Sequence, residues 1–216
     1  MRTSKLSVPV FRCSSVKWGC AALVALCGAL LARATTVEPP TFEALVNSSD
    51  YIIRAKTKSV SAEKKTTDHG VKIVTHVELE ILEVVGGAPP AQLTLQLLGG
   101  RVGDDEMIVE GMPRFHAGDE DILFVSGNGR TICPLYGMMH GRYSVRTDAS
   151  TGRKYVTRAN GSPLHDTAQI ASPMAEAAAT EPAQWQAAVA TALGPTDFIR
   201  QIRSSIKPDA RLNRAK

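Results

Sequence analysis

The amino-acid sequence predicts a mainly β protein, a small antiparallel barrel or sandwich, with one short helix before the sheet and two helices after it. Odd-numbered residues from Ile73 to Ile81 are apolar or threonine, whereas His76, Glu78 and Glu80 lie between them. This alternation has the period of a strand with one buried face. Glycine-rich and proline-rich segments separate this strand from those that follow, which favours antiparallel hairpins, and an OB-like barrel is one arrangement that fits.

The β domain is expected to span residues 35–164. Thr41 can cap a short helix through Asn47, and Lys64 to Gly70 is expected to be a hairpin loop. Residues 122–125 are wholly apolar, as in a strand buried on both sides. An acidic loop is expected at residues 101–106. We expect strands at residues 51–60, 71–85, 92–98, 122–125, 131–133, 142–146 and 154–158.

The C-terminal region changes character. Residues 165–179 are rich in Ala and Ser without a clear period, which predicts a linker. A helical appendage is expected at residues 180–206, with Thr180 capping a first helix that ends before Gly194 and Thr196 capping a second. The apolar stripe of the second helix comprises Phe198, Ile199, Ile202 and Ile206. Residues 207–216 are expected to form a basic, solvated tail.

Residues 1–34 resemble a signal peptide, with a positively charged leader, an apolar run from Trp18 to Leu31 and small residues at Ala32 and Ala34. We expect cleavage between Ala34 and Thr35. An uncleaved anchor is the alternative, but the apolar run is shorter than the roughly 20 residues that cross a bilayer. The sequence therefore predicts an exported protein, periplasmic or secreted, with no transmembrane span after cleavage.

Charge and cysteine content narrow the function classes. Five of the 25 basic residues and none of the 21 acidic residues lie in the leader, so the mature chain has 20 basic and 21 acidic residues. This balance does not favour nucleic-acid binding. Cys133 is the only thiol after residue 34, so the mature chain cannot form an internal disulfide.

Two groups of residues with oxygen or nitrogen ligand atoms are candidates for a metal site. His76, Glu78 and Glu80 alternate on one strand, but alternate residues on a solvated strand look the same. Asp104, Asp105 and Glu106 lie in a glycine-flanked loop without the spacing of an EF-hand. Copper could take soft ligands from a third set, although methionines near strand ends are more often core residues. That set comprises Met107, Met112, His116, Cys133, Met138, Met139 and His140.

Nucleophilic catalysis finds little support. Cys133 has His116 and His140 as candidate bases, but it lies at an apolar strand end where a cysteine is usually inert. Ser126 precedes a tight Gly-Asn-Gly turn and lacks the glycine pattern of a nucleophile elbow. Residues 99–103 are glycine-rich but lack the Lys-Ser/Thr and the helix of a phosphate loop. We assign no catalytic, cofactor-binding or metal-binding residue from the sequence.

One stretch carries a resemblance to known proteins. Residues 111–125 read Gly-Met-Pro-Arg-Phe-His-Ala-Gly-Asp-Glu-Asp-Ile-Leu-Phe-Val, a Gly-x-Pro-x-Phe-x-x-Gly-Asp/Glu pattern before an apolar strand. This pattern, within residues 41–146, resembles a group of exported bacterial proteins without an established activity. The strand order is distantly similar to the netrin-like, OB-type barrel of metalloprotease inhibitors. Those inhibitors act through an N-terminal cysteine, which Thr35 does not provide, so the similarity bears on fold alone.

The sequence favours an exported, non-catalytic binding module that contacts an envelope or secreted protein through loops at residues 101–110 and 134–142. Residues 134–139 are unusually apolar for a loop, so they either fold inward or form a contact patch. The alternative is a metal-binding protein or a hydrolytic enzyme that uses its histidines and acidic residues.

Overall fold

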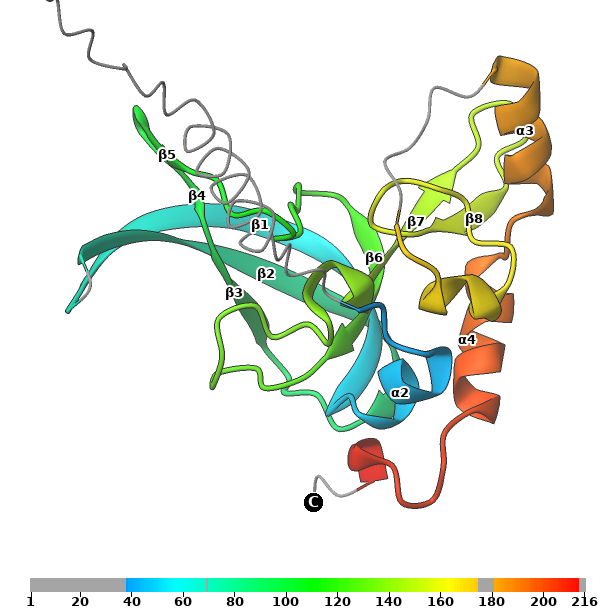
Figure 1. The fold of residues 1–216 in the computed structure, drawn as a ribbon, viewed down its shortest axis with the longest axis horizontal. Helices are drawn as coiled ribbons and strands as arrows, with labels where there is room; N and C mark the ends of the chain where they lie inside the picture. Colours follow the sequence, from blue (N-terminus) through cyan, green and yellow to red (C-terminus); the bar gives the residue numbers. More distant parts are fainter. Residues whose placement is uncertain (1–37, 69, 175–180, 214–216) are drawn as a thin grey trace, which may run out of the picture. The chain divides into compact units, whose positions relative to one another are not determined.

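A six-stranded antiparallel sheet forms the centre of the computed structural model, in the order β3-β2-β1-β6-β7-β8 (Figure 1). The structure describes residues 38–68, 70–174 and 181–213, so the predicted signal peptide and its cleavage site lie outside the described residues. The sheet strands are β1 (Tyr51–Thr67), β2 (Gly70–Gly87), β3 (Leu93–Leu98), β6 (Glu120–Val125), β7 (Arg142–Thr147) and β8 (Lys154–Thr157). A second sheet pairs β4 (Gly100–Val102) with β5 (Asp105–Met107).

The mainly β prediction is confirmed, but the described residues do not form a closed barrel. The strand order is linear, with β3 at one edge and β8 at the other. Connecting segments bond to both edge strands: Cys133 N donates to the Gln96 carbonyl on β3, and Val156 N on β8 donates to the Leu193 carbonyl. Each edge strand is thus hydrogen-bonded to a connecting segment. No pairing among the described residues joins β3 to β8, so the sheet stays open.

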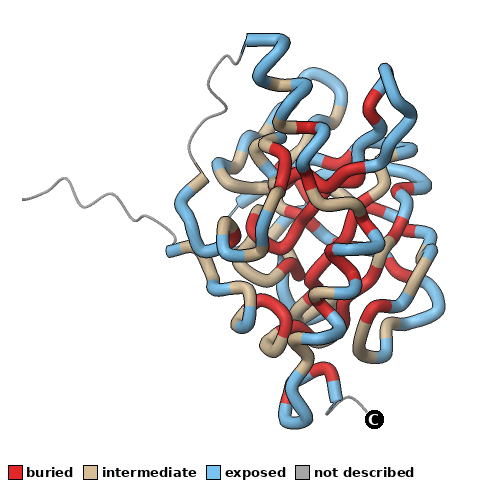
Figure 2. Tube along the Cα trace, turned by 90° about the vertical axis from the view of Figure 1, so that its right-hand side faces the viewer, coloured by how far each residue is buried: buried red, intermediate tan, exposed pale blue. Residues whose placement is uncertain are grey.

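The sheet carries an apolar core on each face. Figure 2 shows that the buried residues are concentrated in the interior of the described chain. On one face Ile53, Val77 and Leu95 pack with side chains from the connecting loops. On the other face Ile52 and Phe124 pack with the helices. The four residues of β6 from Ile122 to Val125 are fully buried, which confirms that this strand is covered on both sides.

The helices and 3-10 turns are α2 (Phe42–Asn47), η1 (Met138–Gly141), η2 (Thr167–Ala171), α3 (Pro182–Thr191), α4 (Pro195–Ser204) and η3 (Arg211–Asn213). Most of them border the core that contains Ile52 and Phe124, whereas α3 packs through Val189 in a separate small cluster with Tyr155. Thr41 caps α2 as predicted, because its Oγ1 accepts a hydrogen bond from Ala44 N at 3.1 Å. No helix among the described residues has the length and apolarity that crossing a membrane requires.

The expected caps of the two C-terminal helices were wrong. Gly194 is the N-cap of α4 and Pro195 occupies its first turn, so the predicted cap at Thr196 lies inside the helix. Proline suits this position because its missing N–H would have no partner there. Glu181 is the N-cap of α3, and the predicted cap Thr180 lies outside the described residues. The predicted stripe is confirmed at Phe198, Ile199 and Ile202, which are buried.

Three expected loops and strands also differ. β1 and β2 stay paired to Thr67 and Gly70, so the hairpin turn is much shorter than the expected loop from Lys64 to Gly70. The acidic loop at residues 101–106 is a small hairpin, β4–β5. Residues 131–133 form no strand, because Cys133 has a φ of 65°, outside the extended region.

The two segments expected to lie outside the core contribute to it. Residues 165–174 of the expected linker contain η2, whose capping box joins Asp166 and Gln169 and whose Ile170 is fully buried. In the expected tail, Leu212 is buried and Lys207 pairs with Glu43. Residues 175–179 and 214–216 lie outside the described residues.

Candidate functional site

A groove with a volume of about 370 Å³ lies between the β1–β2 hairpin, the end of β3, the β4–β5 hairpin and the segment before β6. Its apolar lining includes Val60, Leu97, Ile108, Met112 and Phe115. Ile108 is 68% exposed and Val60 is 39% exposed, so part of this apolar surface faces solvent. Four charged or titratable residues also line it, namely Arg101, Glu106, Arg114 and His116.

Gly99 and Gly100 allow the end of β3 and β4 to approach neighbouring backbone. Their φ values are 97° and 131°, which L side chains rarely adopt. A Cβ on Gly99 would lie 2.8 Å from the Met107 carbonyl oxygen, and one on Gly100 would overlap the Thr75 hydroxyl. Thr75 Oγ1 donates to the Gly99 carbonyl at 2.6 Å. This pair of glycines therefore fixes the β4–β5 hairpin over β2 as one wall of the groove.

A buried arginine supports the opposite wall. Arg142 on β7 has a side chain only 8% exposed, and its Nε donates to Asp121 Oδ1 at 2.8 Å. Its Nη2 donates to Asp119 at 2.9 Å, its Nη1 donates to the Arg114 carbonyl, and its guanidinium lies 4.0 Å from the centroid of the Phe115 ring. One side chain thus holds several residues of the segment that leads into β6.

Backbone bonds fix the same segment to β1. Thr57 N donates to the Asp119 carbonyl, and Gly118 N donates to the Thr57 carbonyl, each at 2.8 Å. Burial raises the pKa of Asp119, but the His116 backbone N–H and Arg142 outweigh it and leave the pKa below its ordinary value. Burial raises the pKa of Asp121 above its ordinary value, although Arg142 and Ser144 oppose the shift. Arg146, whose Nη1 lies 3.8 Å from Asp119 Oδ1, supplies a second positive charge, so two cations face two carboxylates and the network positions the groove wall.

Two of the three residues on β2 that were candidates for a metal site, His76 and Glu78, have other partners. His76 Nε2 lies 3.0 Å from Glu63 Oε1, and Glu78 accepts from Ser59 Oγ at 2.9 Å. Asp105 of the acidic hairpin pairs with Lys64. In the described part of the chain, no three His, Cys, Asp or Glu side chains are grouped so that they could hold a metal ion. His76, Glu78 and Glu80 therefore do not form a site with other ligands of this kind.

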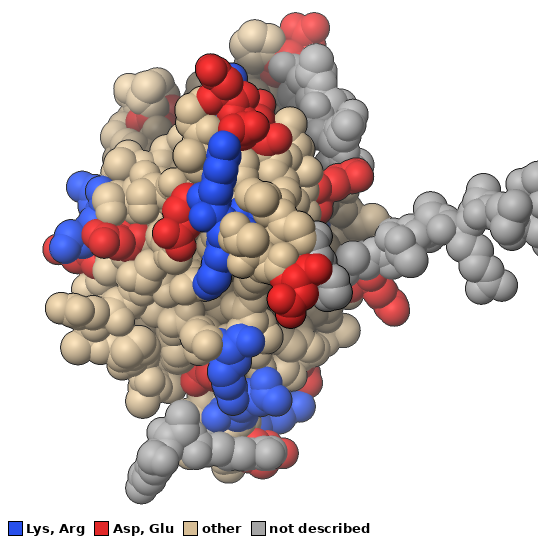
Figure 3. All heavy atoms as spheres, turned by 90° about the vertical axis from the view of Figure 1, so that its left-hand side faces the viewer, with Lys and Arg blue, Asp and Glu red and all other residues tan. Residues whose placement is uncertain are grey.

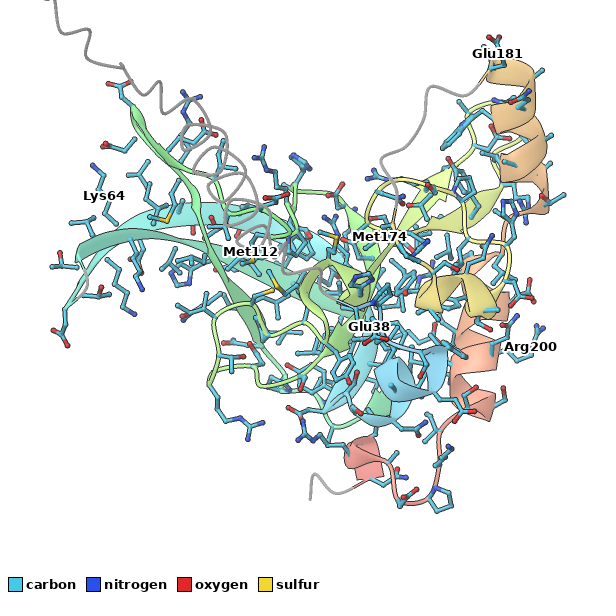
Figure 4. The ribbon with its side chains drawn as sticks, in the orientation of Figure 1. Glu38, Lys64, Met112, Met174, Glu181 and Arg200 are labelled. Carbon is cyan, nitrogen blue, oxygen red and sulfur yellow. The ribbon has the colours of Figure 1, made fainter. Side chains whose placement is uncertain are left out.

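The soft-ligand set is divided between different environments. His140 is 7% exposed, whereas the His116 side chain is 78% exposed. Met112 and Cys133 pack against the core on the groove face. In the view of Figure 4, Met112 lies over the middle of the β1–β2 hairpin and Lys64 lies toward its tip. Both sulfur side chains therefore act as core residues.

Neither candidate nucleophile is activated. Burial raises the pKa of the Cys133 thiol, which disfavours the thiolate. Ser126 Oγ accepts from Arg211 at 3.3 Å and has no described histidine as a hydrogen-bond partner. Residues 99–103 run from the end of β3 into β4, without a following helix. Neither Cys133 nor Ser126 is therefore arranged as a nucleophile, and residues 99–103 are not arranged as a phosphate loop.

Comparison with known proteins yields no match to any family model, to any curated protein or to any solved structure.

One of the two predicted contact loops, residues 101–110, lines the groove, whereas the ion network around Arg142 was not predicted. Residues 101–109, inside the expected contact loop, line the groove in large part. Of the second expected loop, Pro134 and Leu135 are buried and residues 136–139 are half-buried, so this segment folds largely inward. Asp121 immediately before an apolar run and Arg142 at the start of a strand were the available signals, since a charge at a buried strand position requires a partner.

Proposed function

We propose that this chain is an exported, non-catalytic binding module whose groove takes an extended segment of an envelope or secreted protein. The observation that carries the proposal is the open edge of β1 beside the groove. Partners that add a strand to such an edge gain affinity from backbone hydrogen bonds and specificity from alternate side chains.

The edge is open over half of β1. β6 pairs with β1 only from Tyr51 to Lys56, and Thr57 bonds to the segment before β6. From Ser59 to Thr67, β2 is the only described strand that pairs with β1. Unpaired edges of this length are normally covered or blocked, because they expose unpaired N–H and C=O groups. A strand from another molecule would supply hydrogen-bond partners for these N–H and C=O groups.

The open edge and the groove share residues, so a strand added to β1 would bring its side chains to the groove. Val60, Ser61 and Ala62 belong to the edge and line the groove. Val60 and Ala62 face the same side of the hairpin, because they oppose Val77 and Thr75 of β2. We expect the bound segment to present apolar side chains at alternate positions, which would meet Val60 and Ile108.

Charge supports contact with a protein segment and not with nucleic acid. Lys and Arg side chains alternate with Asp and Glu on the face shown in Figure 3, without a large area of one sign. Residues 35–216 carry 20 basic and 21 acidic side chains. Nucleic-acid binding needs a concentrated positive surface. Export is supported by the leader at residues 1–34 and by the resemblance of residues 111–119.

The test uses the chain from residue 35 to residue 216 and a library of linear displayed peptides. A selected peptide is labelled, and its affinity is measured by fluorescence anisotropy. Ile108→Asp is expected to weaken binding at least about tenfold, because the exposed apolar side chain that the peptide would bury is replaced by a carboxylate. Ile132→Asp is the matched control, since Ile132 is 49% exposed and lies outside the groove. Equal affinities for both variants would contradict the proposal.

A further inference from the structure

A second cavity, with a volume of about 400 Å³, opens beside the turn that follows β6. Its lining comes from the start of β1, the loop after β2, the turn at residues 127–130 and η3. The residues that bear chemistry are Asp50, Tyr51, Asn128, Arg130 and Arg211. None of them lines the groove described above. The cavity is therefore a separate place where a ligand could bind.

Tyr51 supplies a buried polar group without a partner. The residue is 6% exposed, and its hydroxyl oxygen has no hydrogen-bond partner among the described residues. Asn128 and Asp50 both influence the pKa of this hydroxyl, and both line the cavity. Asn128 makes no hydrogen bond of normal geometry with the hydroxyl oxygen. An unsatisfied buried hydroxyl is costly, and native proteins retain few of them. The hydroxyl oxygen is also shielded from solvent, so an acceptor bound in the cavity reaches it when the neighbouring Asn128 side chain moves aside.

Two guanidinium groups lie at the same cavity with a single carboxylate between them. Arg130 Nη2 donates to Asp50 Oδ2 at 3.0 Å, and Arg211 Nε lies 3.7 Å from Asp50 Oδ1. Gly127 N also donates to Asp50 Oδ2, at 2.7 Å. Each guanidinium carries five N–H donors, more than these contacts use. Two positive charges against one negative charge leave the cavity lining with an excess of one positive charge.

We propose that this cavity binds a small oxyanion, a phosphate or a carboxylate group, between the Tyr51 hydroxyl and the guanidinium groups of Arg130 and Arg211. An oxyanion fits this lining because it accepts hydrogen bonds and donates none, and because a guanidinium fork matches two of its oxygens. The site is independent of peptide binding in the groove.

The hydroxyl remains a donor at neutral pH. Burial raises the pKa of Tyr51 to about 12, so the phenol keeps its proton and carries no charge that would repel an anion. The ordered C-terminal segment is also part of the site. Leu212 is 4% exposed, so the backbone beside Arg211 is held against the core, while the Arg211 side chain is 56% exposed at the cavity.

The test titrates inorganic phosphate and, separately, acetate into residues 35–216 at low ionic strength, with binding followed by nuclear magnetic resonance. We expect at least one anion to bind, and Tyr51→Phe to weaken that binding about tenfold through loss of one charge-assisted hydrogen bond. Arg130→Gln should also weaken it. The controls are Tyr136→Phe and Arg200→Gln, which remove the same groups away from the cavity.

Melting temperatures measured without the anion show whether a variant has lost a contact to the ligand or has lost its fold. Tyr51→Phe removes a hydroxyl that has no partner, so its melting temperature without phosphate should equal or exceed that of the wild type. The anion that binds should then raise the melting temperature of the wild type more than that of the variant. Preference for phosphate or for acetate identifies the ligand class. Absence of binding by both anions, or unchanged binding by Tyr51→Phe, would overturn the proposal.

Discussion

Arg142 and Asp121 form a two-point ion pair between β7 and β6, with Nε–Oδ1 and Nη2–Oδ2 distances of 2.8 and 3.1 Å. Their side chains are 8% and 1% exposed, so neither charge is solvated by bulk water. The same guanidinium also bonds to the Arg114 carbonyl and lies over the Phe115 ring. This pair therefore couples the central sheet to the wall of the groove.

Arg142→Met should strongly destabilise the protein. The substitution keeps an unbranched side chain but leaves the carboxylate of Asp121, which is 1% exposed, without its guanidinium partner. Breaking a buried pair in this way costs about 3–5 kcal/mol. Urea unfolding followed by circular dichroism measures the change. Asp105→Asn breaks an exposed pair with Lys64 and should cost less than about 1 kcal/mol.

Asp119 should make the protein sensitive to acid. Its pKa in the folded state lies below the ordinary value of 3.8, so it stabilises the fold above about that pH. As the pH falls, the unfolded chain takes up the proton first, and the contribution is lost as the pH falls through the folded-state pKa. Glu120 acts in the same direction, because its pKa is also lowered.

Asp119→Asn is the variant that isolates this effect. It should be less stable than the wild type at pH 7, and the difference should shrink as the pH falls below 3.8. Asp121 contributes with the opposite sign, because its pKa is raised and protonation relieves its burial. Urea unfolding at pH 7 and at pH 3 tests the prediction. A difference that stays constant with pH would contradict it.

Gly100→Ala should distort the β4–β5 hairpin and weaken peptide binding in the groove. A Cβ at this position overlaps the Thr75 hydroxyl, and the φ of 131° is strained for alanine. Gly103→Ala is the control, because Gly103 also has a positive φ, of 61°, but has open space around it. Thermal unfolding and peptide affinity should both change more for Gly100→Ala. Equal effects would show that backbone conformation alone is responsible.

Phe198→Ala should show that α4 belongs to the core. Phe198 is fully buried and lies 5.1 Å from Tyr143 and 6.3 Å from Phe124 between ring centroids. Truncating a buried phenylalanine costs about 3–5 kcal/mol. Phe42→Ala removes a half-buried ring of the same cluster and should cost less. If Phe198→Ala unfolds at the same urea concentration as the wild type, α4 is not packed as described.

Local patterns in the sequence predicted most of the strands. The alternation from Ile73 to Ile81 identified β2, because one face of that strand is in contact with the core through this stretch. The pattern failed at residues 131–133, where Thr131-Ile132-Cys133 is apolar enough for a strand but Cys133 adopts a positive φ. It also failed to extend β1 to Thr67, since polar residues on an exposed hairpin show no periodicity.

The groove could be predicted only in part. Its apolar residues and the segment at residues 111–119 stood out in the sequence, but the partners that position them are remote. Asp121 and Arg142 are 21 positions apart, and their pairing depends on the register of β6 with β7. The open edge of β1 depends on where β6 stops pairing. Neither feature has a local signature, because both arise from strand pairing.

Hydrogen exchange on residues 35–216, with and without a selected peptide, tests peptide binding in the groove most directly. A peptide that adds a strand to β1 should slow exchange at alternate backbone amides between Ser59 and Thr67, because they gain hydrogen-bond partners. Amides of β8, at the other edge of the sheet, should be unaffected. Protection at β8, or none in β1 under saturating peptide, would contradict strand addition at the groove.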